Sequence, residues 1–175
     1  MRIWTIGHST RAIDEFISLF EENGLKLLAD VRAWPSSKRY PQFNKDALAE
    51  SLAAHGIRYE HFPELGGKRK ANPDSRNTAW RNASFRGYAD YMETEQFQKG
   101  IERLLDVAAE AGSTAIMCAE AVWWRCHRSL IADYLKARGV EVLHILGANK
   151  VEPHPYTSVA RIVNGELSYR PESLL

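Results

Sequence analysis

The chain has 175 residues, of which 45% are hydrophobic and 26% are charged, and this length and composition suit one globular domain with a sizeable core. Its formal net charge of +1 excludes a strong overall field for nucleic acid or membrane lipid, so an electrostatic function has to come from local clusters. No apolar run approaches the roughly 20 residues of a membrane span, and the N-terminus lacks a signal-peptide pattern, so we expect a cytoplasmic protein with two reduced cysteines.

The first part of the chain predicts strands that alternate with helices. Residues 2–7 are rich in β-forming residues, and apolar residues then recur at helical spacing from 13 to 20. A second strand is predicted over residues 25–32, a helix over 45–55 and a third strand over 57–62. The segment 63–84 is long, polar and without periodicity, which is typical of a functional loop.

The same alternation continues in the second part. Residues 85–111 predict helical structure that breaks near 93–95 into two helices. A fourth strand is predicted over residues 114–118, a helix over 128–138 and a fifth strand over 142–146. The tail, residues 147–175, contains a predicted hairpin over 160–169 that turns at Asn164-Gly165.

Each of four predicted helices ends in glycine just before a strand, at Gly24, Gly56, Gly112 and Gly139. Glycine accepts the left-handed conformation that commonly ends a helix. Four such junctions predict a single three-layer, doubly wound α/β domain over residues 1–175, with a mainly parallel five-stranded sheet and a C-terminal β-hairpin. We expect the Rossmann-like strand order 3-2-1-4-5, with a switch point between strands one and four.

Chemically active side chains follow the carboxyl ends of three predicted strands, where an open parallel sheet binds its ligands. His8 and Ser9 follow strand one, and Asp30, Arg32 and Ser36 come with strand two. The residues at and after strand four are Cys118, Glu120, Arg125, Cys126, His127 and Arg128. The opposite edge receives only the glycine turns, so this asymmetry predicts a binding or catalytic site.

Two loops over the same edge carry excess positive charge. Residues 32–45 contain four basic residues and no acid, and residues 68–86 contain six basic residues against Asp74 alone. The helix that begins near Arg128 adds unpaired N–H groups and the positive end of its dipole. We therefore expect a small anionic ligand, a phosphate or a nucleotide-like molecule, with nucleic acid as a possible partner and no membrane.

Several short motifs along the chain resemble the prokaryotic domain of unknown function 488 family. They are Gly7-His8-Ser9, Asp30-Val31-Arg32, Leu65-Gly66-Gly67, residues 85–92, Cys118-Ala119-Glu120 and Cys126-His127-Arg128. Many relatives carry proline in the connecting loop, where this chain has Trp123-Trp124. The resemblance covers nearly the whole chain and supports the fold and the site residues, and it implies no particular reaction.

Our leading hypothesis is an enzyme, a hydrolase or a transferase, that acts on a phosphorylated or nucleotide-like ligand. Arg32, Arg125 and Arg128 are expected to hold the anion, and His8 and Ser9 to bind the substrate by hydrogen bonds. Ser36, Tyr88 and Cys126 complete the expected ligand site. The expected catalytic residues are Glu120, Cys118, His127 and Asp30, as acids, bases or nucleophiles.

Other interpretations stay open from the sequence. Glu120 is equally suited to an ion pair with Arg32 or Arg128, and Cys118 to the core. A phosphatase-like loop is disfavoured because residues 121–124 are bulky, and a metal site because Cys118 and Cys126 lack a close-spaced Cys or His pair. The alternative functions are a non-catalytic nucleotide or nucleic-acid binding module and a thiol or metal sensor. No cofactor is identified.

Overall fold

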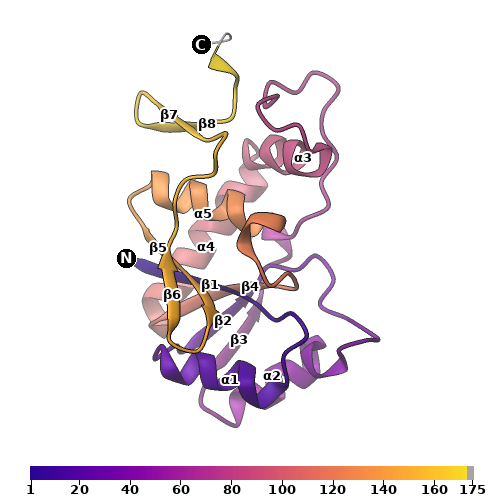
Figure 1. The fold of residues 1–175 in the computed structure, drawn as a ribbon, viewed down its shortest axis with the longest axis vertical. Helices are drawn as coiled ribbons and strands as arrows, with labels where there is room; N and C mark the ends of the chain where they lie inside the picture. Colours follow the sequence, from indigo (N-terminus) through magenta and orange to yellow (C-terminus); the bar gives the residue numbers. More distant parts are fainter. Residues whose placement is uncertain (173–175) are drawn as a thin grey trace.

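Alternate side chains of the buried strands point to opposite faces of one sheet, and each face is covered by its own helices. The computed structural model describes residues 1–172. The sheet contains β1 (Arg2–Gly7), β2 (Leu27–Asp30), β3 (Arg58–His61), β4 (Thr114–Cys118), β5 (Glu141–Gly147) and β6 (Lys150–Pro153). The helices are α1 (Ile13–Glu22), α2 (Lys45–Ala53), α3 (Ala83–Met92), α4 (Glu95–Ala111) and α5 (Arg128–Ala137). The predicted three-layer α/β fold is confirmed (Figure 1).

Two apolar cores lie on the two faces of the sheet. Ala115 and Met117 of β4 pack with Phe16 and Phe20 of α1, and α2 covers the same face. Their neighbours in β4, Ile116 and Cys118, face the other way and pack with helices α3, α4 and α5. Every residue of β4 is buried. A fully buried and mainly apolar strand is therefore placed where helices cover it on both faces.

The predicted strand order 3-2-1-4-5 is wrong. The observed order is β3-β2-β4-β1-β5-β6, with β4 inserted between β2 and β1. Both β1 and β4 are central and apolar, so their burial pattern does not say which of them lies beside β2. The two strands are still parallel neighbours, and Gly7 lies opposite Cys118. Because β2 also borders β4, a crevice can form on both sides of the β4 carboxyl end.

The prediction of five sheet strands is also wrong, because β6 adds an antiparallel sixth. This segment contains Pro153, is mostly exposed and lies in the tail, where the sequence predicts only the later hairpin. Proline is tolerated there because β6 is an edge strand. The C-terminal hairpin is confirmed as β7 (Arg161–Val163) and β8 (Glu166–Ser168).

The boundaries of the helices follow local signals. The four predicted glycine junctions all have positive φ, from 64° at Gly24 to 107° at Gly112. The break between α3 and α4 is at Thr94, whose side chain caps α4 by accepting from the Phe97 N–H. Within residues 1–172, no helix combines the length and hydrophobicity needed to cross a membrane.

The tail after β5 is held by a buried polar chain. His144 Nε2 lies 2.7 Å from His154 Nδ1, and His154 Nε2 lies 2.8 Å from an Asp133 carboxylate oxygen. The hydroxyls of Thr157 and Tyr169 also donate to Asp133. All the ring nitrogens have partners if both imidazoles are neutral and the Thr5 hydroxyl donates to His144. Helix α5 and the tail are thereby joined to the sheet.

Candidate functional site

A cleft of about 760 Å³ opens over the carboxyl ends of β1, β2 and β4. Its walls come from the loops that follow these strands, from the loop after β3 and from the first two turns of α3. Ten of the twelve predicted site residues line it: His8, Ser9, Arg32, Ser36, Tyr88, Cys118, Glu120, Arg125, Cys126 and His127. Asp30 and Arg128 are outside the lining and lie buried near it.

Backbone pairing beyond the strand ends holds these loops together. The N–H of His8 donates to Cys118 O at 2.9 Å, and the N–H of Ser9 donates to Ala119 O at 2.9 Å. Gly7 passes so close that a Cβ there would lie 1.6 Å from the Glu120 carbonyl oxygen. The first and fourth strands therefore continue as a closely fitted pair into the cleft.

His8 is positioned as a neutral hydrogen-bond acceptor. Its ring stacks on Phe43, with centroids 4.4 Å apart, and its Nδ1 lies 2.8 Å from Ser9 O. Burial, outweighing the hydrogen bond to Ser9, lowers the pKa of His8, and the nearby Arg32 lowers it further. A neutral ring that donates through Nδ1 leaves the Nε2 lone pair available. Ser9 has the unusual positive φ of 51°, as expected where a backbone is held in one position for function.

Asp30 positions Arg32 rather than lining the cleft. The Asp30 carboxylate accepts from Arg32 Nε at 2.9 Å and Nη2 at 2.7 Å, and it also accepts the Tyr59 hydroxyl. Arg32 Nη2 donates to Phe43 O as well. Within residues 1–172, the hydrogen bonds of Arg32 do not use Nη1. The guanidinium is therefore held rigidly with one nitrogen left for a ligand.

Arg128 lies underneath the loop that follows β4. Its side chain is only 1% exposed, and Nη2 donates to Glu120 O at 3.0 Å. Its Nε has no hydrogen-bond partner, and none of the ion pairs within residues 1–172 includes Arg128. A buried guanidinium without a carboxylate leaves uncompensated positive charge below the cleft.

Glu120 is an exposed carboxylate at the cleft, and among residues 1–172 it is the only acid in the lining. The ion pair with Arg32 or Arg128 that we considered is absent from the described residues, because Arg32 pairs with Asp30 and Arg128 contacts only the backbone of Glu120. The carboxylate is therefore free to act on a ligand.

Cys118 and Cys126 are free thiols, with sulfur atoms 2.7 Å apart. Burial and the neighbouring Cys126 raise the pKa of Cys118. Burial also acts to raise the pKa of Cys126, but the hydrogen bond with Cys118 and the charge of Arg128 outweigh it and lower that pKa. Cys126 is therefore the thiol that ionises more readily.

His127 lies beside Cys126, at the start of α5. Its Nε2 lies 2.9 Å from Val31 O, so a neutral ring donates there and keeps the lone pair on Nδ1. This Nδ1 lies 3.5 Å from Cys126 Sγ. Burial lowers the pKa of His127 and favours the neutral ring. Gly67 leaves room for it, since a Cβ there would lie 3.0 Å from Nδ1.

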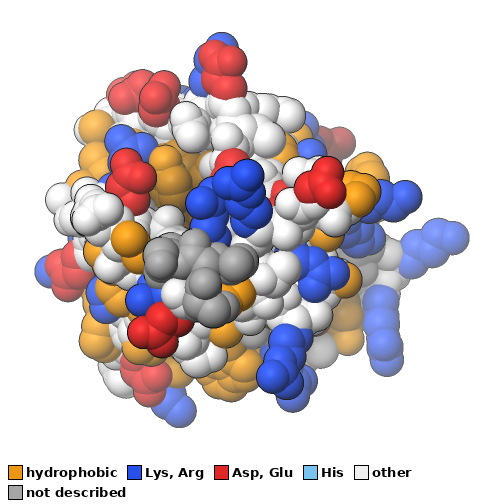
Figure 2. All heavy atoms as spheres, turned by 90° about the horizontal axis from the view of Figure 1, so that it is seen from above, with side chains coloured by type: hydrophobic (Ala, Val, Ile, Leu, Met, Phe, Trp, Pro, Cys, Tyr) orange, Lys and Arg blue, Asp and Glu red, His pale blue; other side chains and the backbone are white. Residues whose placement is uncertain are grey.

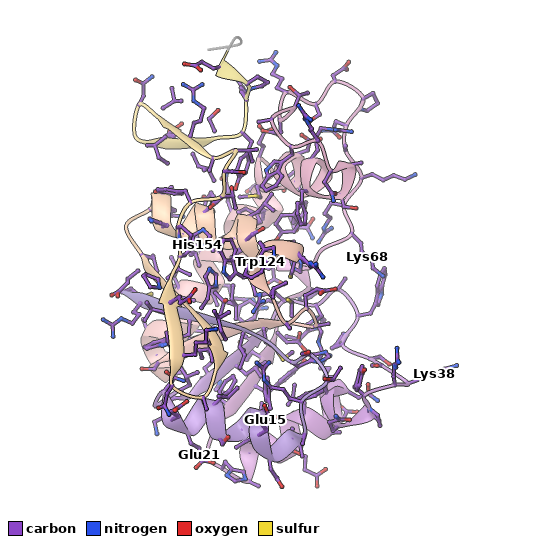
Figure 3. The ribbon with its side chains drawn as sticks, viewed as in Figure 1. Glu15, Glu21, Lys38, Lys68, Trp124 and His154 are labelled. Atoms are coloured by element: carbon purple, nitrogen blue, oxygen red, sulfur yellow. The ribbon has the colours of Figure 1, made fainter. Side chains whose placement is uncertain are left out.

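The cleft also contains cationic and aromatic side chains that are not among the predicted site residues. Arg39, Lys68, Trp34, Tyr40 and Phe85 line it, and the Lys68 ammonium lies 4.9 Å from the centre of the Trp34 ring. Lys38 and Lys68 project from the right of the molecule in Figure 3. Figure 2 shows Lys and Arg side chains projecting on the same side. The sequence pattern that could have identified these side chains is the mixture of aromatic and basic residues in the two basic loops, residues 32–45 and 68–86.

The long loop between β3 and α3 is held in place by hydrogen bonds. Asp90 of α3 accepts from the Asn72 N–H, the Ser75 hydroxyl and the Asn77 amide, at 2.6–2.8 Å. The Tyr88 hydroxyl, which we expected to face the ligand, donates to Leu65 O at 2.8 Å. Tyr88 therefore lines the cleft, but its hydroxyl is used to fix the loop.

In the part of the chain that the structure describes, no group of three or more His, Cys, Asp or Glu side chains is arranged to hold a metal ion. The chemistry that the cleft can perform with its own side chains is anion binding, acid–base transfer and thiol chemistry.

Comparison with known proteins identifies a family. The family model described as Domain of unknown function DUF488 matches residues 12–135, which is more than half of the chain. The matched range contains all the predicted site residues except His8 and Ser9. No curated protein and no solved structure matches the chain.

Proposed function

Because this chain belongs to the family described as Domain of unknown function DUF488, a name that specifies no reaction, we propose its function from the cleft itself. The protein is an enzyme that acts on a phosphorylated or nucleotide-like anionic ligand bound over the carboxyl edge of the sheet. The observation that carries this proposal is the charge of the lining: Arg32, Arg39, Lys68 and Arg125 against Glu120 alone.

The cationic side chains hold the anion. Arg125 is exposed and forms no ion pair within residues 1–172, and Arg32 presents Nη1 from its rigid pair with Asp30. Guanidinium groups suit the oxygens of a phosphate. Trp34 is 69% exposed beside them, and its ring is suited to stack on a planar group such as a base.

The acid–base chemistry is assigned to Glu120 together with Cys118 or His127. Glu120 is the free carboxylate, and His8 offers Nε2 as a hydrogen-bond acceptor for the substrate beside Ser9. Asp30 and Arg128 act as positioning residues, through Arg32 and through the loop that carries Glu120. A free carboxylate beside a thiol, an imidazole and positioned cations is suited to hydrolysis or group transfer at a phosphorylated centre.

Binding is tested by titration calorimetry with inorganic phosphate and adenosine monophosphate at low salt. Both should bind the wild-type protein, and Arg125→Ala should weaken binding by about tenfold, as expected for the loss of one charge-assisted hydrogen bond. Lys26→Ala is the matched control, because it removes a cation next to the amino end of β2, at the opposite edge of the sheet. Equal weakening by both variants, or no binding to the wild type, would remove the proposed anion site.

Catalysis is tested by turnover of a panel of phosphate esters and nucleotides. Glu120→Gln should lower kcat by about 100-fold or more and leave the melting temperature nearly unchanged, because the side chain is exposed. Glu102→Gln, at an exposed position of α4, should retain full activity. Undiminished turnover by Glu120→Gln would refute the assignment, whereas binding without turnover in the wild type would identify a non-catalytic binding module.

A further inference from the structure

We propose that Cys118 and Cys126 are a peroxide-oxidised dithiol that closes a reversible intrachain disulfide in the wall of the cleft. The site takes a small hydroperoxide as its oxidant. This inference uses the same cleft as the proposed anion site and shares Cys118, Cys126 and His127 with it, but the reaction requires no anion, so it is tested without one.

The two sulfurs are already in contact. Cys118 ends β4 and Cys126 immediately precedes the first turn of α5, and the loop between them returns the chain to bring the sulfurs 2.7 Å apart. A disulfide bond is about 2.05 Å long, so little movement separates the thiol pair from the bonded state. Both cysteines line the cleft, which gives a small oxidant a route to them.

The surroundings assign the attacking role to Cys126. Its sulfur accepts the Arg128 N–H at 3.4 Å, and the His127 Nδ1 lone pair lies 3.5 Å away to take the thiol proton. The Arg128 guanidinium adds a buried positive charge that no carboxylate within residues 1–172 neutralises. Backbone N–H groups at a helix start and a nearby cation both favour a thiolate.

Cys118 has the complementary role of the resolving thiol. It is 3% exposed, and its Sγ lies 3.8 Å from the Glu120 carbonyl oxygen, so its contacts do not favour the ionised form. Its sulfur faces Cys126 directly. A protonated thiol in this place attacks only after its neighbour has become electrophilic.

The chemistry proceeds in two steps. The Cys126 thiolate attacks the terminal oxygen of the hydroperoxide, the O–O bond breaks, and the alkoxide leaves and takes up a proton to give the alcohol, or water from hydrogen peroxide. The sulfur of Cys118 then attacks the sulfur of the Cys126 sulfenic acid, the S–O bond breaks, and water leaves with the Cys118 proton. Two thiols lose two electrons in total, and the peroxide gains them.

The test treats the purified protein with a small molar excess of hydrogen peroxide, blocks the remaining thiols by alkylation, and identifies the products by mass spectrometry. We expect a disulfide that links the peptides of Cys118 and Cys126, with no dimer, and its full reversal by dithiothreitol. The chain contains only these two cysteines, so the double variant C118S/C126S is a blank for every reaction. Two unmodified thiols, a disulfide between two molecules or irreversible oxidation to sulfinic acid would each overturn the proposal.

Single variants test the two roles. In Cys118→Ser, a dimedone probe should trap sulfenic acid on Cys126, and in Cys126→Ser, Cys118 should react at least roughly tenfold more slowly. Comparable rates would overturn the assignment of the attacking thiol. Because both thiols are buried, circular dichroism establishes that each variant is folded. The disulfide in the wild-type protein remains a decisive measurement if a variant does not fold.

Discussion

The indole ring of Trp123 lies parallel to the imidazole ring of His144, with centroids 4.6 Å apart and planes 5° from parallel. The loop after β4 therefore rests on the buried polar chain that holds the tail. Burial, followed by the electrostatic influence of the neighbouring His154 and of the Arg128 guanidinium, lowers the pKa of His144 to about 2. The ring is neutral in the folded protein at pH values at which an exposed histidine is charged.

We expect the free energy of unfolding to decrease as the pH falls below about 6.5. In that range His144 is protonated in the unfolded chain but stays neutral in the folded protein. Its contribution to stability is therefore fully present above the unfolded pKa of 6.5 and is lost as the pH falls toward the folded value of about 2. The slope from this one group approaches about 1.4 kcal/mol per pH unit.

Urea unfolding at pH 7 and at pH 5 measures this slope. His144→Phe keeps an aromatic ring against Trp123 but has no titrating group, so its slope should be smaller than that of the wild type. His55→Gln is the control, because His55 is exposed and forms only a surface ion pair with Glu21. If the wild type and His144→Phe have equal slopes, His144 is not the source of the acid sensitivity.

Replacing Gly7 by alanine should destabilise the protein by at least about 3 kcal/mol, because overpacking displaces the backbone. The added Cβ would lie 1.6 Å from the Glu120 carbonyl oxygen, and backbone cannot yield as a flexible side chain does. Gly147→Ala at the end of β5 has nothing within 4 Å of the added Cβ and should change stability by less than about 0.5 kcal/mol. Thermal unfolding of the two variants measures the contrast, and equal melting temperatures would contradict it.

Asp30→Asn should destabilise the protein by about 3–5 kcal/mol, since it leaves the buried guanidinium of Arg32 without its counter-charge. Tyr59→Phe removes one hydrogen bond to the same carboxylate and should cost about 1 kcal/mol. Chemical denaturation compares the two variants. A loss in Asp30→Asn no larger than that in Tyr59→Phe would show that the ion pair does not fix Arg32.

Asp90→Ala should release the loop between β3 and α3 without unfolding the domain. Three hydrogen bonds from residues 72–77 converge on this carboxylate, so the amide hydrogens of that segment should exchange faster in the variant. Asp106→Ala, at an exposed position of α4, is the control and should leave the exchange rates unchanged. Unaltered exchange in Asp90→Ala would mean that other contacts hold the loop.

The gathering of His8, Arg32 and Cys118 at one edge was predictable, because parallel strands that alternate with helices all end at the same side of their sheet. The four glycine junctions and the hairpin at Asn164-Gly165 carried strong local signals. The position of β4 between β2 and β1 was not predictable in this way. It depends on which strand pairs with β2. Both β1 and β4 are largely buried and apolar, so their sequences do not distinguish the two arrangements.

The individual roles within the site depend on contacts between distant parts of the chain. Asp30 was a plausible catalytic acid until the structure paired it with Arg32 and Tyr59. The two cysteines were visible as a pair, but their different ionisation depends on Arg128 and on how the loop folds back. Trp34 and Lys68 come from different basic loops, and no spacing in the sequence indicates that they meet.

The central position of β1 has a consequence for experiments on the segment that the family model matches. The family match begins at residue 12, after β1 has ended. Yet β1 pairs with β4 on one side and with β5 on the other, so the sheet of a fragment cut at residue 12 would fall into two unconnected halves. The matched segment also ends at residue 135, before β5, so it contains only β2, β3 and β4 of the sheet, and a fragment for expression has to keep both the first eleven residues and β5.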